Sequence, residues 1–308
     1  ATAGENVWTN VGGQSGDIEP FTFQGIAYGW AVGGYPSSST IQKYSFTSDG
    51  NSVDSGQDLA YSGGNKYSGA AACSQDNGYM MGNDASYVNT IEKWSFGSGG
   101  NATDVGNLLV ATAFSNSHSN GTYVWNTGGE RTGGAEDKIQ RFAVASDGDT
   151  IDQGDLTRAC AYHGSGNSST YGYTTMGSEG PKTNIIDKHA FANNNNATDV
   201  GDCLDSLNGG SGNSSTTYGY TQGGSPNTNR ISKYTFASDN NATDVGNMIW
   251  SRGYRNGASS TDYGYGAGGW APALVDIDKY TFASDNNATD VGDLSGSTAM
   301  VGGTQSDV

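Results

Sequence analysis

The chain has 308 residues and carries 31 acidic against 14 basic side chains, a net charge of −17. This balance excludes nucleic acid as a partner, because the protein has too little positive charge to neutralise phosphates, and it disfavours an anionic membrane surface. Leu, Ile, Val and Phe together number only 43, as in disordered chains, yet 18 Tyr and 6 Trp supply bulky apolar surface. No run approaches the roughly 18 apolar residues of a membrane span, and residues 1–25 lack a signal-peptide profile. We therefore expect a folded protein without membrane insertion.

One unit is repeated six times along the chain. Its anchor, Ile-x-(Lys/Arg)-aromatic, recurs at intervals of 45 to 50 residues, at Ile41, Ile91, Ile139, Ile186, Ile231 and Ile277. A period of this length is typical of repeat folds. We therefore expect residues 1–308 to form a single domain built from repeats.

Each copy contains four pieces with strand character. The first is a run of small residues, as in 69–74, and the second carries an aromatic residue and ends in glycine, as in 263–269. The third is the anchor, in which Tyr234 and Phe236 alternate with polar side chains, and the fourth reads Ala-Thr-Asp-Val-Gly after a turn rich in Asp, Asn and Gly. Alternation with period two indicates half-buried strands, and these turn residues suit hairpins. The chain is thus predicted to be all-β, with four-stranded antiparallel sheets and no helices.

The second strand of most copies ends in a pair of glycines. The pairs are 33–34, 128–129, 223–224 and 268–269, and an aromatic residue stands three positions before each (Trp30, Trp125, Tyr220, Tyr265). A four-stranded unit of this length with such a doublet resembles the kelch repeat, which implies a β-propeller blade. Kelch repeats usually carry a tryptophan on the outer strand, and Asp-Val-Gly stands in its place here, so the resemblance is to a divergent kelch-like group.

The two ends of the chain each look like part of a repeat. Residues 9–12 match the outer-strand motif, and residues 297–308 match the beginning of an inner strand. Overlapping ends would close a ring and remove the exposed edges of the sheets. We therefore predict a six-bladed kelch-like propeller, with a seven-bladed ring as the alternative.

An aspartate follows the cation of every anchor by eleven residues. The pairs are Lys43–Asp54, Lys93–Asp104, Arg141–Asp152, Lys188–Asp199, Lys233–Asp244 and Lys279–Asp290. Across a hairpin of the third and fourth strands the two charges would face each other, and such a pair contributes about 0.2–1 kcal/mol. We predict six cross-strand salt bridges that fix the register of these hairpins.

Residues that could support catalysis are scattered. The three cysteines have no Cys-x-x-Cys spacing, which argues against zinc and thiol exchange. His118, His163 and His189 fall at three different repeat positions, so we expect them to share no copper site. The carboxylates stand in turns or opposite lysines, without the paired arrangement that glycoside hydrolysis needs. We therefore predict that the protein is not an enzyme.

Asp285, Asn287, Thr289, Val291 and Asp293 stand at the alternate positions from which calcium loops supply ligands, with Val291 at the position that uses its backbone carbonyl. The stretch lacks the glycine of the sixth position and the acid of the twelfth. We therefore predict an ordinary hairpin and no cofactor, with calcium binding as the alternative.

Large aromatic and arginine side chains gather in two of the four connections of each copy. In a four-stranded antiparallel blade, the connection between the second and third strands lies on the same face as the connection to the next blade. That face would carry Tyr35, Tyr61, Tyr67, Tyr87, Trp250, Arg252, Tyr254, Arg255 and Trp270, with Phe114 and Tyr162 beside them. Aromatic residues and arginine are enriched at contact surfaces, so we predict the first nine as binding residues. The alternative is that several of them pack between blades.

The acid-rich, lysine-poor repeats, in which Asn, Gly, Ser and Tyr are frequent, resemble those of surface and appendage proteins of marine phages. This resemblance and the aromatic face imply a non-catalytic module on an extracellular or virion surface. It would engage a cell-surface glycan or a neighbouring structural protein, as a single chain or a homo-oligomer. The alternatives are a secreted bacterial adhesin or surface protein, and a carbohydrate-active hydrolase or oxidase.

Overall fold

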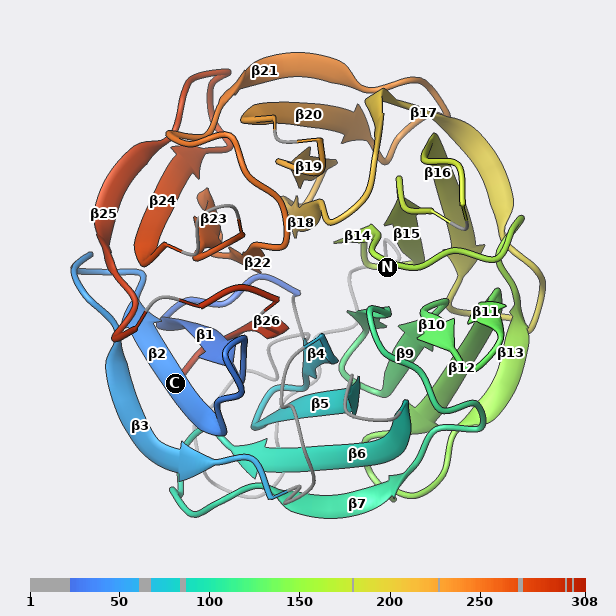
Figure 1. Ribbon diagram of the computed structural model, residues 1–308, viewed down its shortest axis with the longest axis horizontal. Helices are drawn as coiled ribbons and strands as arrows, with labels where there is room; N and C mark the ends of the chain where they lie inside the picture. Colours follow the sequence, from blue (N-terminus) through green and yellow to red (C-terminus); the bar gives the residue numbers. More distant parts are fainter. Residues whose placement is uncertain are drawn as a thin grey trace, which may run out of the picture.

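The structure, a computed structural model, describes residues 23–60, 68–83, 87–178, 180–226, 228–270, 274–296, 298–300 and 302–308. Within these ranges the backbone forms strands and turns and no helix. The strands make six four-stranded antiparallel sheets and one two-stranded hairpin. The six sheets surround a common axis (Figure 1), so the chain is a six-bladed β-propeller. The prediction of an all-β, six-bladed ring is confirmed.

Each blade has four strands between the axis and the rim, and blades 1 to 6 follow the order of the repeats. The inner strands are β26 (Gly302–Ser306), β4 (Ala70–Cys73), β8 (Asn116–Ser119), β14 (Gly164–Asn167), β18 (Ser211–Ser214) and β22 (Asn256–Ser259). The second strands are β1 (Tyr28–Val32), β5 (Asn77–Asn83), β9 (Tyr123–Thr127), β15 (Tyr171–Thr175), β19 (Tyr218–Gln222) and β23 (Tyr263–Ala267). The third strands are β2 (Thr40–Ser45), β6 (Val88–Ser95), β12 (Lys138–Ala143), β16 (Thr183–Ala190), β20 (Arg230–Thr235) and β24 (Asp276–Thr281). The outer strands are β3 (Val53–Asp58), β7 (Thr103–Asn107), β13 (Ile151–Asp155), β17 (Thr198–Leu207), β21 (Thr243–Asn247) and β25 (Thr289–Asp293). Blade 3 also carries the hairpin of β10 (Glu130–Arg131) and β11 (Gly134–Ala135).

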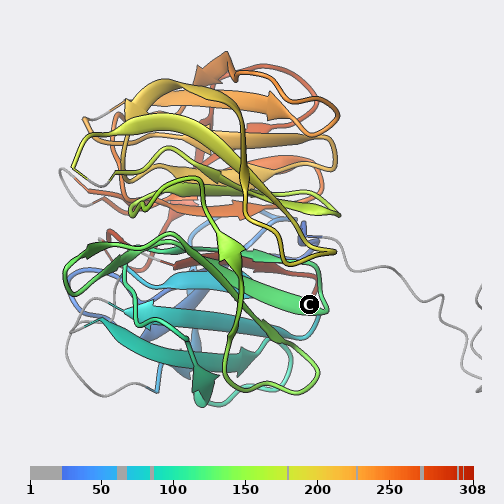
Figure 2. The same cartoon turned by 90° about the vertical axis from the view of Figure 1, so that its right-hand side faces the viewer.

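The last strand of the chain completes the first blade. β26 pairs antiparallel with β1, with Val32 opposite Gly302 and Tyr28 opposite Ser306. The indole Nε1 of Trp30 also donates to Ser306 Oγ at 2.9 Å. Overlapping ends therefore close the ring, as predicted for the C-terminal segment, whereas the motif at residues 9–12 lies outside the described residues. Figure 2 shows the disc from its rim.

Aromatic side chains fill the space between blades, and glycine makes room for them. A Cβ at Gly78 on β5 would lie 2.1 Å from the ring of Trp94 on β6, and four other blades show the same contact. Aromatic residues of the second strands contact a phenylalanine of the following blade, and Trp125 stacks on Phe191 with ring centroids 4.2 Å apart. These contacts explain why most second strands begin aromatic-Gly-aromatic.

The Asp-Val-Gly motif of the outer strands joins each blade to the next. In every blade, including blades 1 and 3 where Ser55 and Gln153 replace the valine, the glycine N–H donates to the aspartate two residues earlier, as Gly246 does to Asp244 Oδ1 at 3.2 Å. Gly246 has a φ of 151°, and a Cβ there would lie 2.4 Å from the carbonyl oxygen of Asn286 in the following blade. The next N–H, that of Asn247, donates to Asn287 Oδ1 of that blade at 3.0 Å. The backbone of this motif is therefore packed against, and hydrogen-bonded to, the neighbouring blade.

The predicted cross-strand salt bridges are wrong, because the hairpins adopt another register. In blade 5, Lys233 lies opposite Thr243, and Asp244 lies opposite Ser232. The observed register differs by one residue from the expected one, and a shift of one residue sends a side chain to the other face of the sheet. None of the six predicted pairs forms a salt bridge in the part of the chain that the structure describes.

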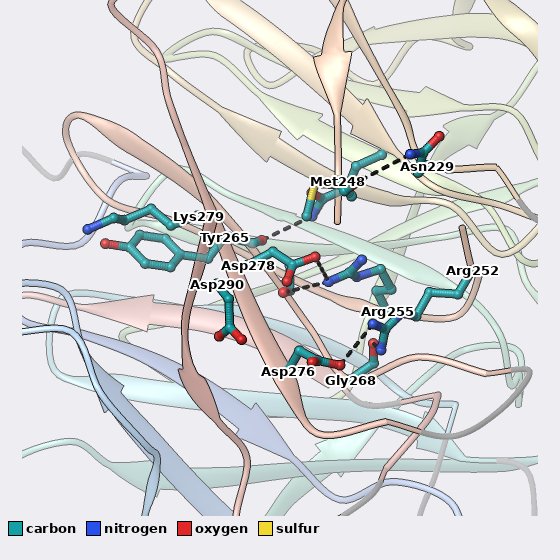
Figure 3. Close-up of polar contacts among 12 residues, drawn as sticks. Asn229, Met248, Arg252, Arg255, Tyr265, Gly268, Asp276, Asp278, Lys279 and Asp290 are labelled. Carbon is teal, nitrogen blue, oxygen red and sulfur yellow. Dashed lines mark hydrogen bonds and ion pairs between the residues drawn. The ribbon is translucent and has the colours of Figure 1, made fainter. Parts of the chain in front are cut away.

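The lysines instead bridge neighbouring blades. Lys279 Nζ lies 2.6 Å from Asp49 Oδ2, which belongs to the turn between the third and outer strands of blade 1. Figure 3 shows that Lys279 extends away from Asp290, its predicted partner. The same inter-blade bridge is formed by Lys93–Asp147, Lys188–Asp239 and Lys233–Asp285. These four lysine bridges therefore connect blades, whereas the bridges within the hairpins of blades 3 and 5 are made by Lys138 and Arg230.

Candidate functional site

Six residues that stand just before the inner strands surround the axis. We call them the collar: Ser68, Phe114, Tyr162, Gly209, Tyr254 and Met300. All six have a positive φ, between 52° and 69°. Five of them are not glycine, although this left-handed conformation costs a residue with a side chain roughly 1–2 kcal/mol. The surrounding structure must hold them in place, and residues in such conformations are concentrated at functional sites.

Backbone hydrogen bonds join the collar residues into a closed ring. The N–H of each one donates to the carbonyl oxygen of the collar residue in the preceding blade, over 2.6–3.0 Å. The bond from Ser68 to Met300, at 2.9 Å, connects the early and late parts of the chain. Every collar N–H and carbonyl is used in this ring, which makes the collar a fixed frame for its side chains.

The collar lines a narrow well on the axis. The cavity has a volume of about 110 Å³, and its wall continues onto the first residues of the inner strands. Aromatic rings form one side of it: the centroids of Phe114 and Tyr162 lie 4.2 Å apart, and those of Tyr162 and Tyr254 lie 6.0 Å apart. A Cβ at Gly209 would lie 2.8 Å from the Tyr254 ring, so the glycine makes room for this tyrosine.

A carboxylate lies beside the collar. Tyr162 donates its phenolic hydrogen to Glu130 Oε2, which belongs to the β10–β11 hairpin inserted in blade 3. Burial, reinforced by this carboxylate, raises the pKa of Tyr162, so the phenol stays protonated and remains a donor. The backbone of Glu130 exchanges two hydrogen bonds with Ala113, the residue before Phe114. Negative charge is therefore held at the edge of the well.

Two serines that line the well have hydroxyl groups with no protein partner in the described chain. They are Ser68 of the collar and Ser211 at the start of β18, and both hydroxyl oxygens are buried. The hydroxyl of Ser115, by contrast, accepts a hydrogen bond from Asn126 at 2.8 Å. A buried hydroxyl without a partner destabilises the protein that contains it. The wall of the well therefore contains two buried hydroxyl groups whose hydrogen bonds are unsatisfied by the described chain.

Three of the predicted binding residues expose aromatic rings outside the collar. Trp250 is 52% exposed, Trp270 39% and Tyr35 38%. Tyr35 and Trp270 come from blades 1 and 6, and their rings meet edge to face with centroids 5.1 Å apart. The backbones of Tyr35 and Trp270 bond to the residues directly before Met300 and Tyr254 of the collar. The exposed rings and the collar thus share one face.

The two predicted arginines lie inside blade 6. Arg252 Nη2 is 2.9 Å from Asp276 Oδ2, and Arg255 Nη2 is 2.5 Å from Asp278 Oδ2 (Figure 3). Both guanidinium groups also donate to backbone carbonyls, Arg252 to that of Gly268. Their positive charges are neutralised within the blade instead of being presented on its face.

The other predicted binding residues divide into three groups. Tyr254 belongs to the collar, Tyr87 is half-buried between β5 and β6, and Tyr61 and Tyr67 lie outside the described residues. The collar residues Ser68, Gly209 and Met300, and Glu130 beside them, were not predicted. A signal was present, because the six collar residues recur at intervals of 46, 48, 47, 45 and 46 residues, two positions before each small-residue strand.

Two of the three histidines lie together, although their repeat positions differ. His118 and His189 are buried with ring centroids 4.9 Å apart. Burial lowers the pKa of His189 to about 3 and that of His163 to about 4, and it lowers the pKa of His118 well below its usual value. All three are therefore neutral at neutral pH. No three His, Cys, Asp or Glu side chains in the described ranges lie close enough to share a metal ion.

The calcium-like stretch in blade 6 uses two of its oxygen groups in contacts between blades. Asp285 pairs with Lys233 of the preceding blade, and Asn287 Oδ1 accepts the N–H of Asn247. The stretch forms the turn and outer strand of the β24–β25 hairpin. Its fold is the predicted hairpin, with these side chains facing the neighbouring blade.

No protein-family model matches the chain, and no curated protein matches it. The described residues contain no helix able to cross a lipid bilayer. The fold and the site define the class of protein by themselves: a six-bladed β-propeller with a collar of left-handed residues around a narrow well and exposed aromatic rings on the same face.

Proposed function

We propose that this protein is a non-catalytic recognition module displayed on an extracellular or virion surface, where its collar-bearing face engages a cell-surface glycan. We also place it, as a divergent member, among the kelch-type propellers. The glycine doublets support this placement, since both glycines of each pair have positive φ, as in Gly33 at 67° and Gly34 at 122°. Only glycine adopts such successive conformations without strain.

The proposal depends on one observation, the gathering of aromatic rings on one face. Tyr35, Trp250 and Trp270 are exposed outside the collar, and Tyr162 and Tyr254 stand within it. Tyrosine and tryptophan supply large contact area at a low cost in side-chain entropy, which is why recognition surfaces are rich in them. A face of this kind suits a ligand that has both apolar and hydroxyl-bearing surface, as a glycan does.

The composition of the well supports recognition in preference to catalysis. In the described chain its lining includes no Asp or Glu, whereas glycoside hydrolysis uses two carboxyl groups about 5 to 9.5 Å apart. His163 lines the well, but its Nε2 is hydrogen-bonded to Thr127 O at 3.0 Å, and its pKa of about 4 makes it a weak base at neutral pH. The well therefore has the groups of a binding site without a matched acid and base.

A glycan array tests the proposal. The wild type should bind a restricted set of glycans, and the double variant Trp250→Ala, Trp270→Ala should lose most of that signal. The matched control is the double variant Tyr171→Ala, Tyr218→Ala. It removes two other exposed rings, each 37% exposed, which lie on second strands near the opposite face. Equal signal from all three proteins would contradict the proposal.

The alternative partner is a neighbouring structural protein. A wild-type protein that binds no glycan but co-purifies with virus particles, as seen by mass spectrometry, would favour that alternative over glycan recognition.

A further inference from the structure

We propose that the central well is the subsite for one terminal, uncharged sugar ring of a glycan. This inference rests on the proposed function and names the ligand class and the residues of the subsite. The ring would pack against Tyr162 and Tyr254 and bond to the hydroxyls of Ser68 and Ser211. The exposed rings of Trp250 and Trp270 would then contact the rest of the glycan outside the collar.

The size of the well suits an end group and not a chain. Its volume of about 110 Å³ lies far below the pockets of about 300–1,000 Å³ that hold drug-sized ligands. One small ring can therefore enter, while the following sugars remain at the mouth. A terminal sugar has one glycosidic linkage within the glycan, so no second linkage has to fit inside the well.

The two sides of the well match the two surfaces of a sugar ring. One side is formed by the rings of Phe114, Tyr162 and Tyr254, and the rest is largely serine and glycine. A pyranose has a C–H face that packs on an aromatic ring and an edge of hydroxyls that need polar partners. The hydroxyls of Ser68 and Ser211 are buried without a protein partner in the described chain, so sugar hydroxyls would satisfy them.

The charge around the well favours an uncharged sugar. Glu130 bonds to Tyr162 at the edge of the well, and the whole chain carries a charge of −17. The guanidinium of Arg255, a basic residue in the lining, is neutralised by Asp278. A sialic or uronic acid would meet negative charge without a free cation among the described lining residues, which makes its carboxylate unfavourable there.

The collar prepares this subsite before any ligand arrives. Six inter-blade hydrogen bonds hold the left-handed backbone from which Tyr162 and Tyr254 project. A ligand binding to a frame that is already ordered loses less affinity to side-chain ordering than one binding to a mobile loop. The need for an ordered subsite would explain why five collar residues other than glycine adopt the unfavourable left-handed conformation.

The test titrates the full chain with methyl glycosides of uncharged hexoses, observed by saturation-transfer NMR, with the methyl glycoside of N-acetylneuraminic acid as the anionic probe. The uncharged probes should bind, and the anionic probe should not. Ser211→Ala should weaken binding about 3- to 10-fold, as expected for the loss of one neutral hydrogen bond. Tyr254→Ala should weaken it about tenfold or more through loss of the aromatic wall.

Two controls separate an effect on binding in the well from an effect on folding and from the loss of an exposed ring elsewhere. Ser211→Ala removes a buried hydroxyl that has no protein partner in the described chain, so its melting temperature should equal or exceed that of the wild type. Tyr218→Ala removes an exposed ring near the opposite face and should leave monosaccharide binding unchanged. If the array shows glycan binding but Ser211→Ala and Tyr254→Ala bind the probes like the wild type, the well is not the subsite, although the proposed function stands. Preferential binding of the anionic probe would also overturn the inference, and absence of any glycan binding would overturn both proposals.

Discussion

The imidazole rings of His118 and His189 meet edge to face between blades 3 and 4, 4.9 Å apart at their centroids. His189 occupies the position where other third strands carry an aromatic residue, and Gly172 leaves the space that both rings fill. Burial lowers the pKa of both, and the neighbouring His189 lowers that of His118 further. The folded protein therefore contains a pair of histidines that must remain neutral.

This pair predicts that stability falls as the solution becomes acidic. The folded-state pKa values of both histidines lie below the unfolded value near 6.5, so the unfolded chain binds protons first as the pH drops. The contribution of the pair is complete above pH 6.5 and is lost as the pH falls toward 3, the pKa of His189. We expect the free energy of unfolding to decrease by about 2 kcal/mol or more between pH 7 and pH 4.5. His189→Phe, which restores an aromatic residue, should flatten this dependence in denaturant titrations, and an unchanged pH profile would show that the histidines are not responsible.

Among the described residues, two anchor cations lack the inter-blade salt bridge, and for Lys43 the sequence shows why. The turn of the following blade carries Gly99 at the position that Asp49 and Asp147 hold in the turns bound by Lys279 and Lys93. Gly99 has a φ of 65°, close to the 51° and 52° of those aspartates, and a Cβ there would meet no atom within 4 Å. Gly99→Asp should therefore add a bridge to Lys43 and stabilise the fold by about 0.2–1 kcal/mol. The gain should disappear in the Lys43→Met background and at high salt; a gain that survives both would have another cause.

The glycine of the outer-strand motif is predicted to be indispensable. Gly246→Ala combines an unfavourable φ of 151° with a Cβ only 2.4 Å from the backbone of Asn286. We expect a loss of about 1–3 kcal/mol in the free energy of unfolding, measured by urea titration. Gly50→Ala is the matched control, since its φ of 107° is also positive but its Cβ would have no neighbour within 4 Å. Equal losses in the two variants would mean that the contact between blades adds nothing.

The buried pair of Arg255 and Asp278 should respond strongly to the loss of one partner. Both side chains are at most 1% exposed, so Arg255→Met leaves a carboxylate uncompensated in the interior, at a cost of about 3–5 kcal/mol. Arg252→Met should cost less, because its partner Asp276 is 20% exposed and can be hydrated. Thermal unfolding of the two variants checks the order, and the reverse order would contradict this account of blade 6.

Most of the fold could be predicted because the same sequence pattern occurs six times along the chain. Six anchors, four strand-like pieces in each copy, and a C-terminal fragment of an inner strand were enough to predict a closed six-bladed ring. The salt bridges could not be read correctly, because a one-residue difference in hairpin register moved the aspartates away from the lysines. The turns contained a hint: the lysines of the four inter-blade bridges face turns that carry Asp49, Asp147, Asp239 and Asp285.

The site was harder to predict than the fold. Its exposed aromatic residues were found because connections on one face of a blade can be recognised from strand order. The collar was missed in part because backbone conformation, and not residue type, unites Ser68, Gly209 and Met300 with their aromatic counterparts. The partners of Arg252 and Arg255 were missed because they lie 24 and 23 residues further along the chain, with no periodic pattern to link them.

The central claim is that the collar-bearing face recognises a glycan, and a crystal structure with the strongest ligand from the array tests it most directly. Sugar density is expected against Tyr162 and Tyr254, with the remainder of the glycan passing toward Trp250 or Trp270. Density confined to the outer strands or to the opposite face of the disc would contradict it.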